Sequence, residues 1–330
     1  MSTKTLIKTC LFTNGRVLTG TTFSVRAAIS QPLRLSGYQQ RCCVATKAEV
    51  NEIIKKYKEG DFNKLPNPDK LLHFRKTDQT DTSETEKPHE VPMGTHALPH
   101  PIWSEEELHN VQITHKPPEG FVDKSAYYCV QTMRKAFDIV SGFSTGERNE
   151  FKWLKRIIFL ETVAGVPGMV AAMTRHLHSL RRMQRDYGWI HTLLEEAENE
   201  RMHLMTALQL KQPSRLFKWS VIGAQGTFVG LFSISYLISP KFCHRFVGYL
   251  EEEAVKTYTK CLQDIENCSM QHWKTQPSPQ VAIDYWKLSE DATMKDVILA
   301  IRADEAHHRL VNHTLASMKP TDYNPYEPGK

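Results

Sequence analysis

The spacing of apolar residues between positions 121 and 318 is that of amphipathic helices, with few signals for strands. Apolar side chains recur three and four residues apart, which places them on one face of a helix. The pattern therefore predicts an all-α domain over 121–318. Six helices are expected, over residues 121–142, 150–186, 189–211, 214–239, 241–266 and 291–318.

Prolines mark the limits of this helical region. Pro213 and Pro240 fall at two helix boundaries, and Pro167 is expected to bend the helix over 150–186. Residues 60–120 hold eight prolines and no sustained period, so 46–120 is predicted to be an extended arm with one short helix over 49–58. Such an arm would be ordered by packing on the helical domain or on a second subunit. The segment 319–330 carries three prolines and is predicted to be an irregular tail.

Two helices carry the same short motif, Glu-x-x-His. The first pair is Glu200 and His203, and the second is Glu305 and His308. At this spacing the two side chains share one face of a helix. Ferritin-like bundles that bind two metal ions use one such pair on each of two helices, and one glutamate on each of two others. A single pair is more often part of a solvated face, so two further glutamates are needed.

Those glutamates are predicted to be Glu161 and Glu251. Both lie among apolar residues at helical spacing, where a carboxylate is costly unless it binds something. Glu252 and Glu253 are expected instead to reach the surface or to surround the ligands. Four buried carboxylates would repel one another and take up protons unless cations neutralise them. Carboxylate-rich ligation with one imidazole per metal suits iron or manganese better than zinc, so two ions of one of these metals are the expected cofactor.

Residues 219–240 carry no charge, and a helix of this length could cross a bilayer. We expect instead that this helix runs back along the bundle, since Glu200 before it and Glu251 after it must meet at one site. The fold predicted is a ferritin-like four-helix di-iron bundle, in which this helix and that over 121–142 are additional and form a membrane-binding face. The alternative is a dimer interface. The expected cationic edge of the face is Lys152, Lys155, Arg156, Arg181, Arg182, Arg215 and Lys218.

The formal net charge of +5 is unevenly distributed. Residues 1–48 hold seven basic residues and no acidic one, which leaves 35 basic and 37 acidic residues for the rest. A near-neutral body argues against a nucleic-acid partner. The acid-free composition of residues 1–45, rich in Ser and Thr, predicts a mitochondrial transit peptide. The seven cysteines include no C-x-x-C pattern, which indicates neither a disulfide framework nor a thiolate metal site.

Four segments together resemble the alternative oxidases, the cyanide-resistant ubiquinol oxidases of the mitochondrial inner membrane. The similarity covers about 121–318 and extends into the arm from residue 96. The segments are Leu160-Glu161-Thr162, Asn199-Glu200-Arg201-Met202-His203-Leu204, Leu250-Glu251-Glu252-Glu253-Ala254 and Arg302-Ala303-Asp304-Glu305-Ala306-His307-His308-Arg309. The ending over 324–329 resembles the animal branch of that family.

The resemblance implies a homodimer on the matrix side of the membrane that oxidises ubiquinol, reduces O2 to water and pumps no protons. It implies the same six iron ligands, Glu161, Glu200, His203, Glu251, Glu305 and His308, and a redox-active tyrosine at Tyr258. The implied quinol pocket is Arg134, Asp138, Arg156, Leu160, Ala254 and Thr257. The implied residues around the ligands are Asn199, His244, Tyr285, Trp286 and Asp304.

Two other functions share parts of this pattern. A di-iron hydroxylase acting on a quinone precursor or a lipid would use the same bundle and need an external reductant. An iron-storage protein would also bind iron, but it would not explain the transit segment or the apolar helices.

Overall fold

The computed structural model describes residues 97–267 and 269–329 of the chain. The predicted transit peptide, the short helix over 49–58 and the first part of the arm lie outside these residues. The described part is helical, and its one β-bridge joins Pro277 to Thr293. The predicted all-α class is confirmed.

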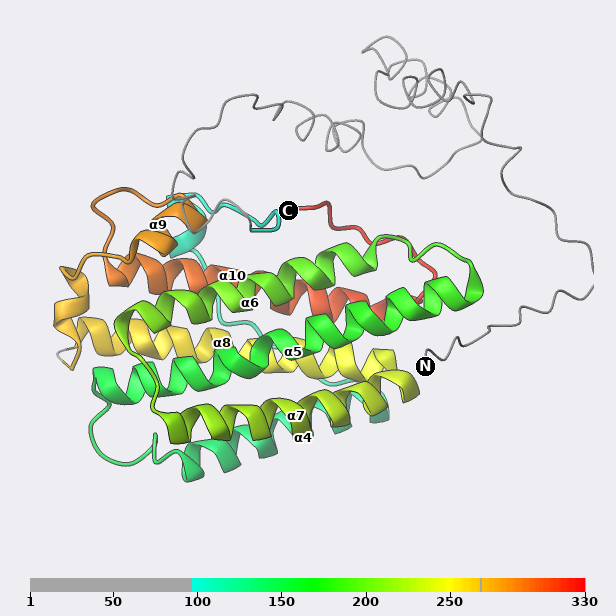
Figure 1. The fold of residues 1–330 in the computed structure, drawn as a ribbon, viewed down its shortest axis with the longest axis horizontal. Helices are drawn as coiled ribbons and strands as arrows, with labels where there is room; N and C mark the ends of the chain where they lie inside the picture. The colour runs from blue at the N-terminus through cyan, green and yellow to red at the C-terminus, as the bar shows by residue number, and fades with distance from the viewer. Residues whose placement is uncertain (1–96, 268, 330) are drawn as a thin grey trace, which may run out of the picture. The chain divides into compact units, whose positions relative to one another are not determined.

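Four long helices form the central bundle: α5 (Glu150–Arg182), α6 (Trp189–Leu210), α8 (Pro240–Glu266) and α10 (Met294–Ser317). Figure 1 shows them running side by side, with α5 packed along α6 and α8 packed along α10. These are the four helices predicted to carry metal ligands. All lie within a few residues of their predicted ranges.

The helix ends follow from local hydrogen-bonding chemistry. Asn149 caps α5 through its side chain, which accepts from the backbone nitrogen of Lys152 at 3.1 Å. Pro240 occupies the first turn of α8, where its missing N–H costs nothing. Helix α5 ends at Arg182, earlier than predicted, because Met183 adopts a left-handed conformation with φ of 52°. Pro167 lies inside α5, which continues past it.

Glycines let α5 approach α6 closely. A Cβ atom at Gly168 would lie 2.6 Å from the carbonyl oxygen of Leu193, and one at Gly165 would lie 3.1 Å from that of Ala197. Such distances leave no room for a side chain at Gly168. The close contact brings Glu161, one to two turns before these glycines, toward the ligands on α6.

Two further helices flank the bundle. Helix α4 (Gly120–Val140) packs on α8, and α7 (Arg215–Ile238) packs on α5 and α8. The only buried side chains of α7 are Phe232 and Tyr236, whereas Leu216 and Trp219 are 81% and 70% exposed. Within the described residues, α5 and α7 are long and apolar enough to cross a membrane, but the apolar window is 44% buried in α5 and only 11% buried in α7.

The arm and the segment before α10 contain short helices that the sequence pattern did not predict. They are α3 (Glu105–His109), the 3-10 helix η3 (Gln271–Lys274) and α9 (Gln280–Trp286). Each is too short to show a helical period. The arm lies against α10, where Arg302 donates to the carbonyl oxygen of Leu108 at 2.9 Å.

Candidate metal centre and substrate pocket

Six side chains from the four bundle helices meet in the core. Glu161 comes from α5, Glu251 from α8, and the two Glu-x-x-His pairs come from α6 and α10. All six are buried, with exposed fractions between 0% for His203 and 6% for Glu161 and Glu251. The six residues predicted from sequence are therefore brought together.

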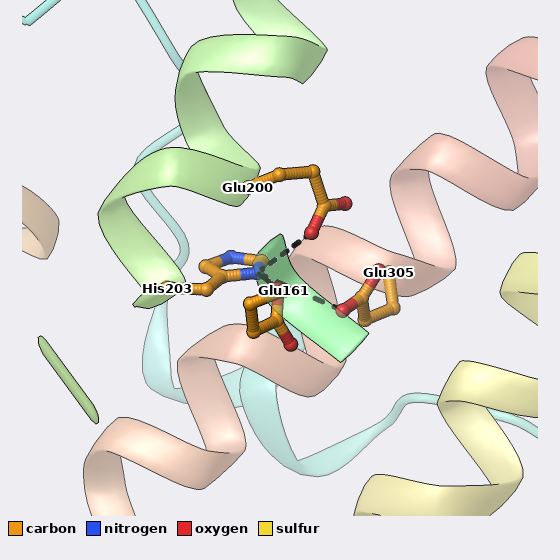
Figure 2. Close-up of side chains that lie close together, drawn as sticks. All are labelled: Glu161, Glu200, His203 and Glu305. Carbon is orange, nitrogen blue, oxygen red and sulfur yellow. Dashed lines mark ion pairs between the residues drawn. The ribbon is translucent and has the colours of Figure 1, made fainter. Parts of the chain in front are cut away.

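The six side chains form two overlapping groups, each suited to one metal ion. The first is Glu161, Glu200, His203 and Glu305, and the second is Glu200, Glu251, Glu305 and His308. Within each group, one ligand atom per residue lies within 4.8 Å of the others. Figure 2 shows the first group converging on His203. The His203 Nδ1 lies 3.4 Å from Glu161 Oε2 and 3.4 Å from Glu200 Oε2. Glu200 and Glu305 belong to both groups, so they would help to hold both ions.

The electrostatics of this cluster fit two cations. Burial, followed by the charge of Glu200, raises the pKa of Glu161 well above its ordinary value. Burial lowers the pKa of His203 and His308, but their carboxylate partners outweigh it and raise both values. Four buried atoms of the ligand cluster have no hydrogen-bond partner: Glu161 Oε2, Glu200 Oε2, Glu305 Oε2 and His203 Nδ1. Buried atoms of this kind are costly unless they ligate a metal, so the residues present fit a di-iron centre.

Asp304 holds the outer side of the first ligand group. Its carboxylate accepts from His203 Nε2 at 3.0 Å, Asn199 Nδ2 at 3.0 Å and Trp286 Nε1 at 2.8 Å. Asn199 also donates to the Tyr285 hydroxyl at 2.9 Å. Hydrogen bonds to the second nitrogen of a metal-binding histidine fix its tautomer and ring orientation. Four of the five residues predicted to surround the ligands thus lie together.

His244, the fifth of these residues, lies elsewhere. Its ring bonds to Asn312 Oδ1 at 3.1 Å and to the Tyr236 hydroxyl at 3.0 Å, and burial lowers its pKa to about 4. Asn312 in turn donates to the backbone carbonyl of His308 at 3.0 Å and to Glu196. His244 therefore reaches the metal cluster only through Asn312.

A large apolar pocket opens onto the ligand cluster. Its volume is about 510 Å³, and its wall includes Glu161, Glu251 and Glu305. The pocket is lined by residues of α4, α5, α7 and α8, and by Glu305 of α10. Five of the six residues predicted for the quinol pocket line it: Arg134, Arg156, Leu160, Ala254 and Thr257.

The sixth, Asp138, joins the two arginines of the pocket. It accepts from Arg156 at 2.7 Å and from Arg134 at 3.1 Å. Burial alone would raise the pKa of Asp138, but the two guanidiniums outweigh burial and lower this pKa below its ordinary value. The Nε of Arg156 has no hydrogen-bond partner and is buried, which leaves a charged donor free in the pocket wall.

Tyr258 connects the pocket to the ligands. Its hydroxyl donates to Glu161 Oε1, and its side chain lines the pocket. Burial, followed by the charge of Glu161, raises the pKa of Tyr258 well above its ordinary value, so the hydroxyl keeps its proton at neutral pH.

Two expectations for charged residues were wrong. Arg156 is 3% exposed and belongs to the pocket, not to a cationic membrane edge, because Asp138 and the ring of Phe143 hold it inside. Of the two places expected for Glu252, the surface or the surroundings of the ligands, the surface is wrong. Glu252 is 2% exposed because the arm covers it, and His115 Nδ1 of the arm lies 2.6 Å from its Oε2. On its other side, His313 Nε2 of α10 lies 3.0 Å from its Oε1.

Sequence reasoning also missed contributors to the site. Trp103 of the arm donates to Asp304 at 2.6 Å, and Glu253 lines the pocket beside Arg134 at 3.3 Å. Trp103 gave no signal, since it lies in a proline-rich segment 201 residues away from Asp304. The triple Glu251-Glu252-Glu253 was a signal, because three consecutive acids on a helix point in different directions.

A helical bundle with two shared carboxylates and two Glu-x-x-His pairs defines the class of ferritin-like two-metal carboxylate proteins. The sequence model described as "Alternative oxidase" matches residues 103–317. The chain belongs to the alternative oxidase family. This confirms the predicted activity, a ubiquinol oxidase with a di-iron cofactor, over the hydroxylase and storage alternatives.

Individual relatives agree with this assignment. The chain is 50% identical over 242 residues to a protein of Emericella nidulans, an alignment that covers 70% of this chain and 68% of the relative. It is 49% identical over 251 residues to a protein of Aspergillus niger, an alignment that covers 72% of this chain and 71% of the relative. It is 48% identical over 250 residues to a protein of Neurospora crassa, which covers 70% of this chain and 69% of that relative. All three are described as "Alternative oxidase, mitochondrial". These relatives are fungal, so they lend no support to the animal-branch resemblance of the C-terminal ending.

Proposed function

We propose that Glu161, Glu200, His203, Glu251, Glu305 and His308 hold the two irons at which this chain oxidises ubiquinol and reduces O2. The observation that carries the proposal is the shared wall: three of these carboxylates line the large pocket. When bound, the two irons supply the redox chemistry that joins quinol oxidation to O2 reduction. Two ubiquinols release four electrons and four protons, and one O2 takes up the same numbers to give two waters. The reaction therefore balances without proton pumping.

The pocket binds the quinol through few polar groups. Arg156 is the donor best placed for a quinol oxygen, because its buried Nε has no other partner. Asp138 holds Arg156 and Arg134 in position, while Leu160 and Ala254 contact the ring and isoprenoid carbons. The Thr257 hydroxyl donates a hydrogen bond to the backbone carbonyl of Glu253 at 2.7 Å. Towards the substrate it can therefore act only as a hydrogen-bond acceptor.

Tyr258 moves a proton between the quinol and the ligand cluster. Its hydroxyl already donates to Glu161 Oε1, so a hydrogen bond links the pocket wall to the ligand cluster. The same tyrosine can give up an electron together with this proton, which is the role of a redox-active tyrosine.

The apolar face formed by α4 and α7 binds one leaflet of a membrane. Phe121 and Val140 at the two ends of α4 are 85% and 86% exposed, and α7 exposes most of its apolar length. The quinol pocket reaches this face, because its lining includes the exposed residues Met133 of α4 and Leu231 of α7. Ubiquinol, which dissolves in lipid, would therefore enter directly from the bilayer.

The location follows from the relatives and the N-terminal composition. The protein is mitochondrial, as its relatives are described, and we place it on the matrix side of the inner membrane. In this arrangement residues 1–45 act as the transit peptide, 46–120 as the arm, 121–318 as the bundle domain and 319–330 as the tail. Protease treatment of mitochondria and of inverted inner-membrane vesicles tests the side, since only the vesicles should expose the bundle.

We propose that two copies associate through α5. A stripe of apolar side chains away from the pocket is exposed along its second half: Met169, Met173, Leu177 and Leu180 at 53%, 49%, 44% and 60%. A like stripe on a second copy would cover it. Native mass spectrometry should find dimers of the wild-type protein and monomers of Leu177→Arg. A Leu231→Arg variant on the membrane face should stay dimeric.

The decisive experiment measures O2 uptake by membranes that contain the protein, supplied with ubiquinol in the presence of cyanide. Wild-type protein should consume O2, whereas Glu200→Ala should lose both iron and uptake. Glu198→Ala is the matched control, since Glu198 lies on the same helix and pairs with Arg201 at the surface. Absence of uptake by wild-type protein that holds two irons per chain would contradict the proposed function and favour a hydroxylase.

A further inference from the structure

A second cavity lies beside the ligand His203. It is bounded by α5, α6, α10 and η3, and Ile157 is the one described residue that lines both this cavity and the quinol pocket. We call it the His203 cavity and define it by Ile157, His203, Thr206, Ala207, Leu210 and Ile298. Its lining residues are buried except for Leu210, which is partly exposed at the C-terminal end of α6.

The size of the His203 cavity restricts its occupant. The space open to the centre of a water-sized sphere is about 10 Å³, which is room for one such sphere. A quinone ring needs far more space, and the quinol pocket next to the cluster provides about 510 Å³. The His203 cavity therefore admits only a water, a diatomic gas or a single atom of similar size.

The polarity of the cavity disfavours water. The side chains with polar groups in its lining are those of His203, Thr206 and Trp273, and the indole N–H of Trp273 already donates to Glu150 at 2.9 Å. The His203 Nε2 is already bonded to Asp304, and its Nδ1 belongs to the ligand group. That leaves the Thr206 hydroxyl, whose oxygen is buried and has no hydrogen-bond partner. A buried water needs two to four polar partners, and apolar cavities without them stay dry and bind apolar gases such as xenon.

We propose that the His203 cavity is a binding site for O2, which reaches it past Leu210 and waits there beside the first ligand group. O2 is small and apolar, and Ile157, Ala207 and Ile298 offer the apolar contacts that it prefers to water. The inference rests on the proposed function, in which O2 is the electron acceptor. It adds that O2 and ubiquinol approach the cluster through different spaces, so that bound quinol does not block O2.

Xenon provides a test that needs no turnover. Crystals of the wild-type protein under xenon pressure should show one xenon atom between Ala207 and Ile298. The larger side chain in Ala207→Leu should fill the cavity and exclude xenon. Ala172→Leu is the matched control, because Ala172 is also buried but packs in the other half of the core, around α5 and Trp189. That variant should keep the xenon.

Steady-state kinetics test the role of the site. Ala207→Leu should raise the KM for O2 about tenfold, which corresponds to ~1.4 kcal/mol of lost binding, with the KM for ubiquinol and the iron content unchanged. If Ala207→Leu does not fold, Ile298→Val tests the reverse effect. Loss of one carbon should enlarge the cavity, raise xenon occupancy and lower the KM for O2. Ile265→Val, a buried isoleucine outside the cavity, should change neither.

Two results would overturn the O2 site: no xenon in the wild-type cavity, or an unchanged KM for O2 in a variant that has lost xenon. A failure of the proposed oxidase function is distinguishable, because it would abolish cyanide-resistant O2 uptake while leaving xenon binding intact.

Discussion

The two sides of the ligand cluster are built in opposite ways. On the side that faces the arm, Asp304 is 0% exposed and accepts hydrogen bonds from His203, Asn199, Trp286 and Trp103. On the side that faces the pocket, polar groups are few, and the Nε of Arg156 has no partner. The first side is rich in hydrogen bonds, and the second keeps the Nε donor of Arg156 free within an apolar wall.

This difference separates two tasks. A carboxylate that accepts four hydrogen bonds is held rigidly and in turn orients the ligand ring of His203, which supports the binding of a metal. A free, desolvated donor is held ready for a substrate, because satisfying it inside the protein would leave nothing to recognise a quinol oxygen. Substitutions on the pocket side should therefore affect turnover and KM, whereas substitutions on the arm side should affect metal affinity and stability.

The largest effect is expected for Tyr258→Phe on the pocket side. Removing the hydroxyl that donates to Glu161 should lower cyanide-resistant turnover by about 10²–10⁴, the range typical of a lost proton-transfer group, while two irons stay bound. O2 uptake with iron analysis measures both. Tyr249→Phe is the matched control on the same helix, because the Tyr249 hydroxyl is buried without a partner. Equal turnover in Tyr258→Phe and the wild type would refute the role of Tyr258.

On the arm side, Asp304→Ala should weaken iron binding about 10–100-fold, because His203 loses the partner that orients its ring. Competition with a chelator measures the affinity. The control is Asp264→Ala, which removes a carboxylate bonded to Arg148 and Trp153 away from the cluster. That variant should be less stable but bind iron normally. A similar loss of iron affinity in both variants would mean that general destabilisation, not ring orientation, explains the effect.

A smaller change is expected for Arg156→Ala. Loss of the free donor should raise the KM for ubiquinol about tenfold, equivalent to ~1.4 kcal/mol, and leave iron content unchanged. Arg156→Lys should recover part of the affinity, since one donor remains. The control is Arg148→Ala, which breaks a partly buried pair with Asp264, 2.7 Å from Arg148 Nε to Asp264 Oδ2. An unchanged KM in Arg156→Ala would show that the guanidinium only supports the pocket wall.

The smallest effect is expected for Trp103→Phe. It removes one of the hydrogen bonds to Asp304 and should cost about 1 kcal/mol of unfolding free energy, because the three other donors remain. Chemical unfolding of the iron-loaded protein measures this cost, and the KM for ubiquinol should not change. A loss of iron as large as in Asp304→Ala would show that the arm, and not the bundle alone, orients His203.

Much of the site was readable from the sequence because it lies on long helices. Glu-x-x-His at i and i+3 places two ligands on one face whatever the rest of the chain does. A glutamate such as Glu161 among apolar neighbours is informative for the same reason, since its burial is implied by its own helix. The residues that were missed or misplaced lie in contacts between segments. Trp103, in the arm, and Glu252, covered by the arm, are examples.

Helical periodicity is a local property, so it was enough to predict the all-α class, the four ligand helices and the six residues that converge between them. Which side of the cluster is closed and which is open depends instead on packing between distant segments. This packing turned Arg156 inward to Asp138, brought Trp103 onto Asp304, and left a small apolar cavity beside His203. Each of these depends on how side chains from distant segments fill a shared space, and no periodicity within a single segment encodes that.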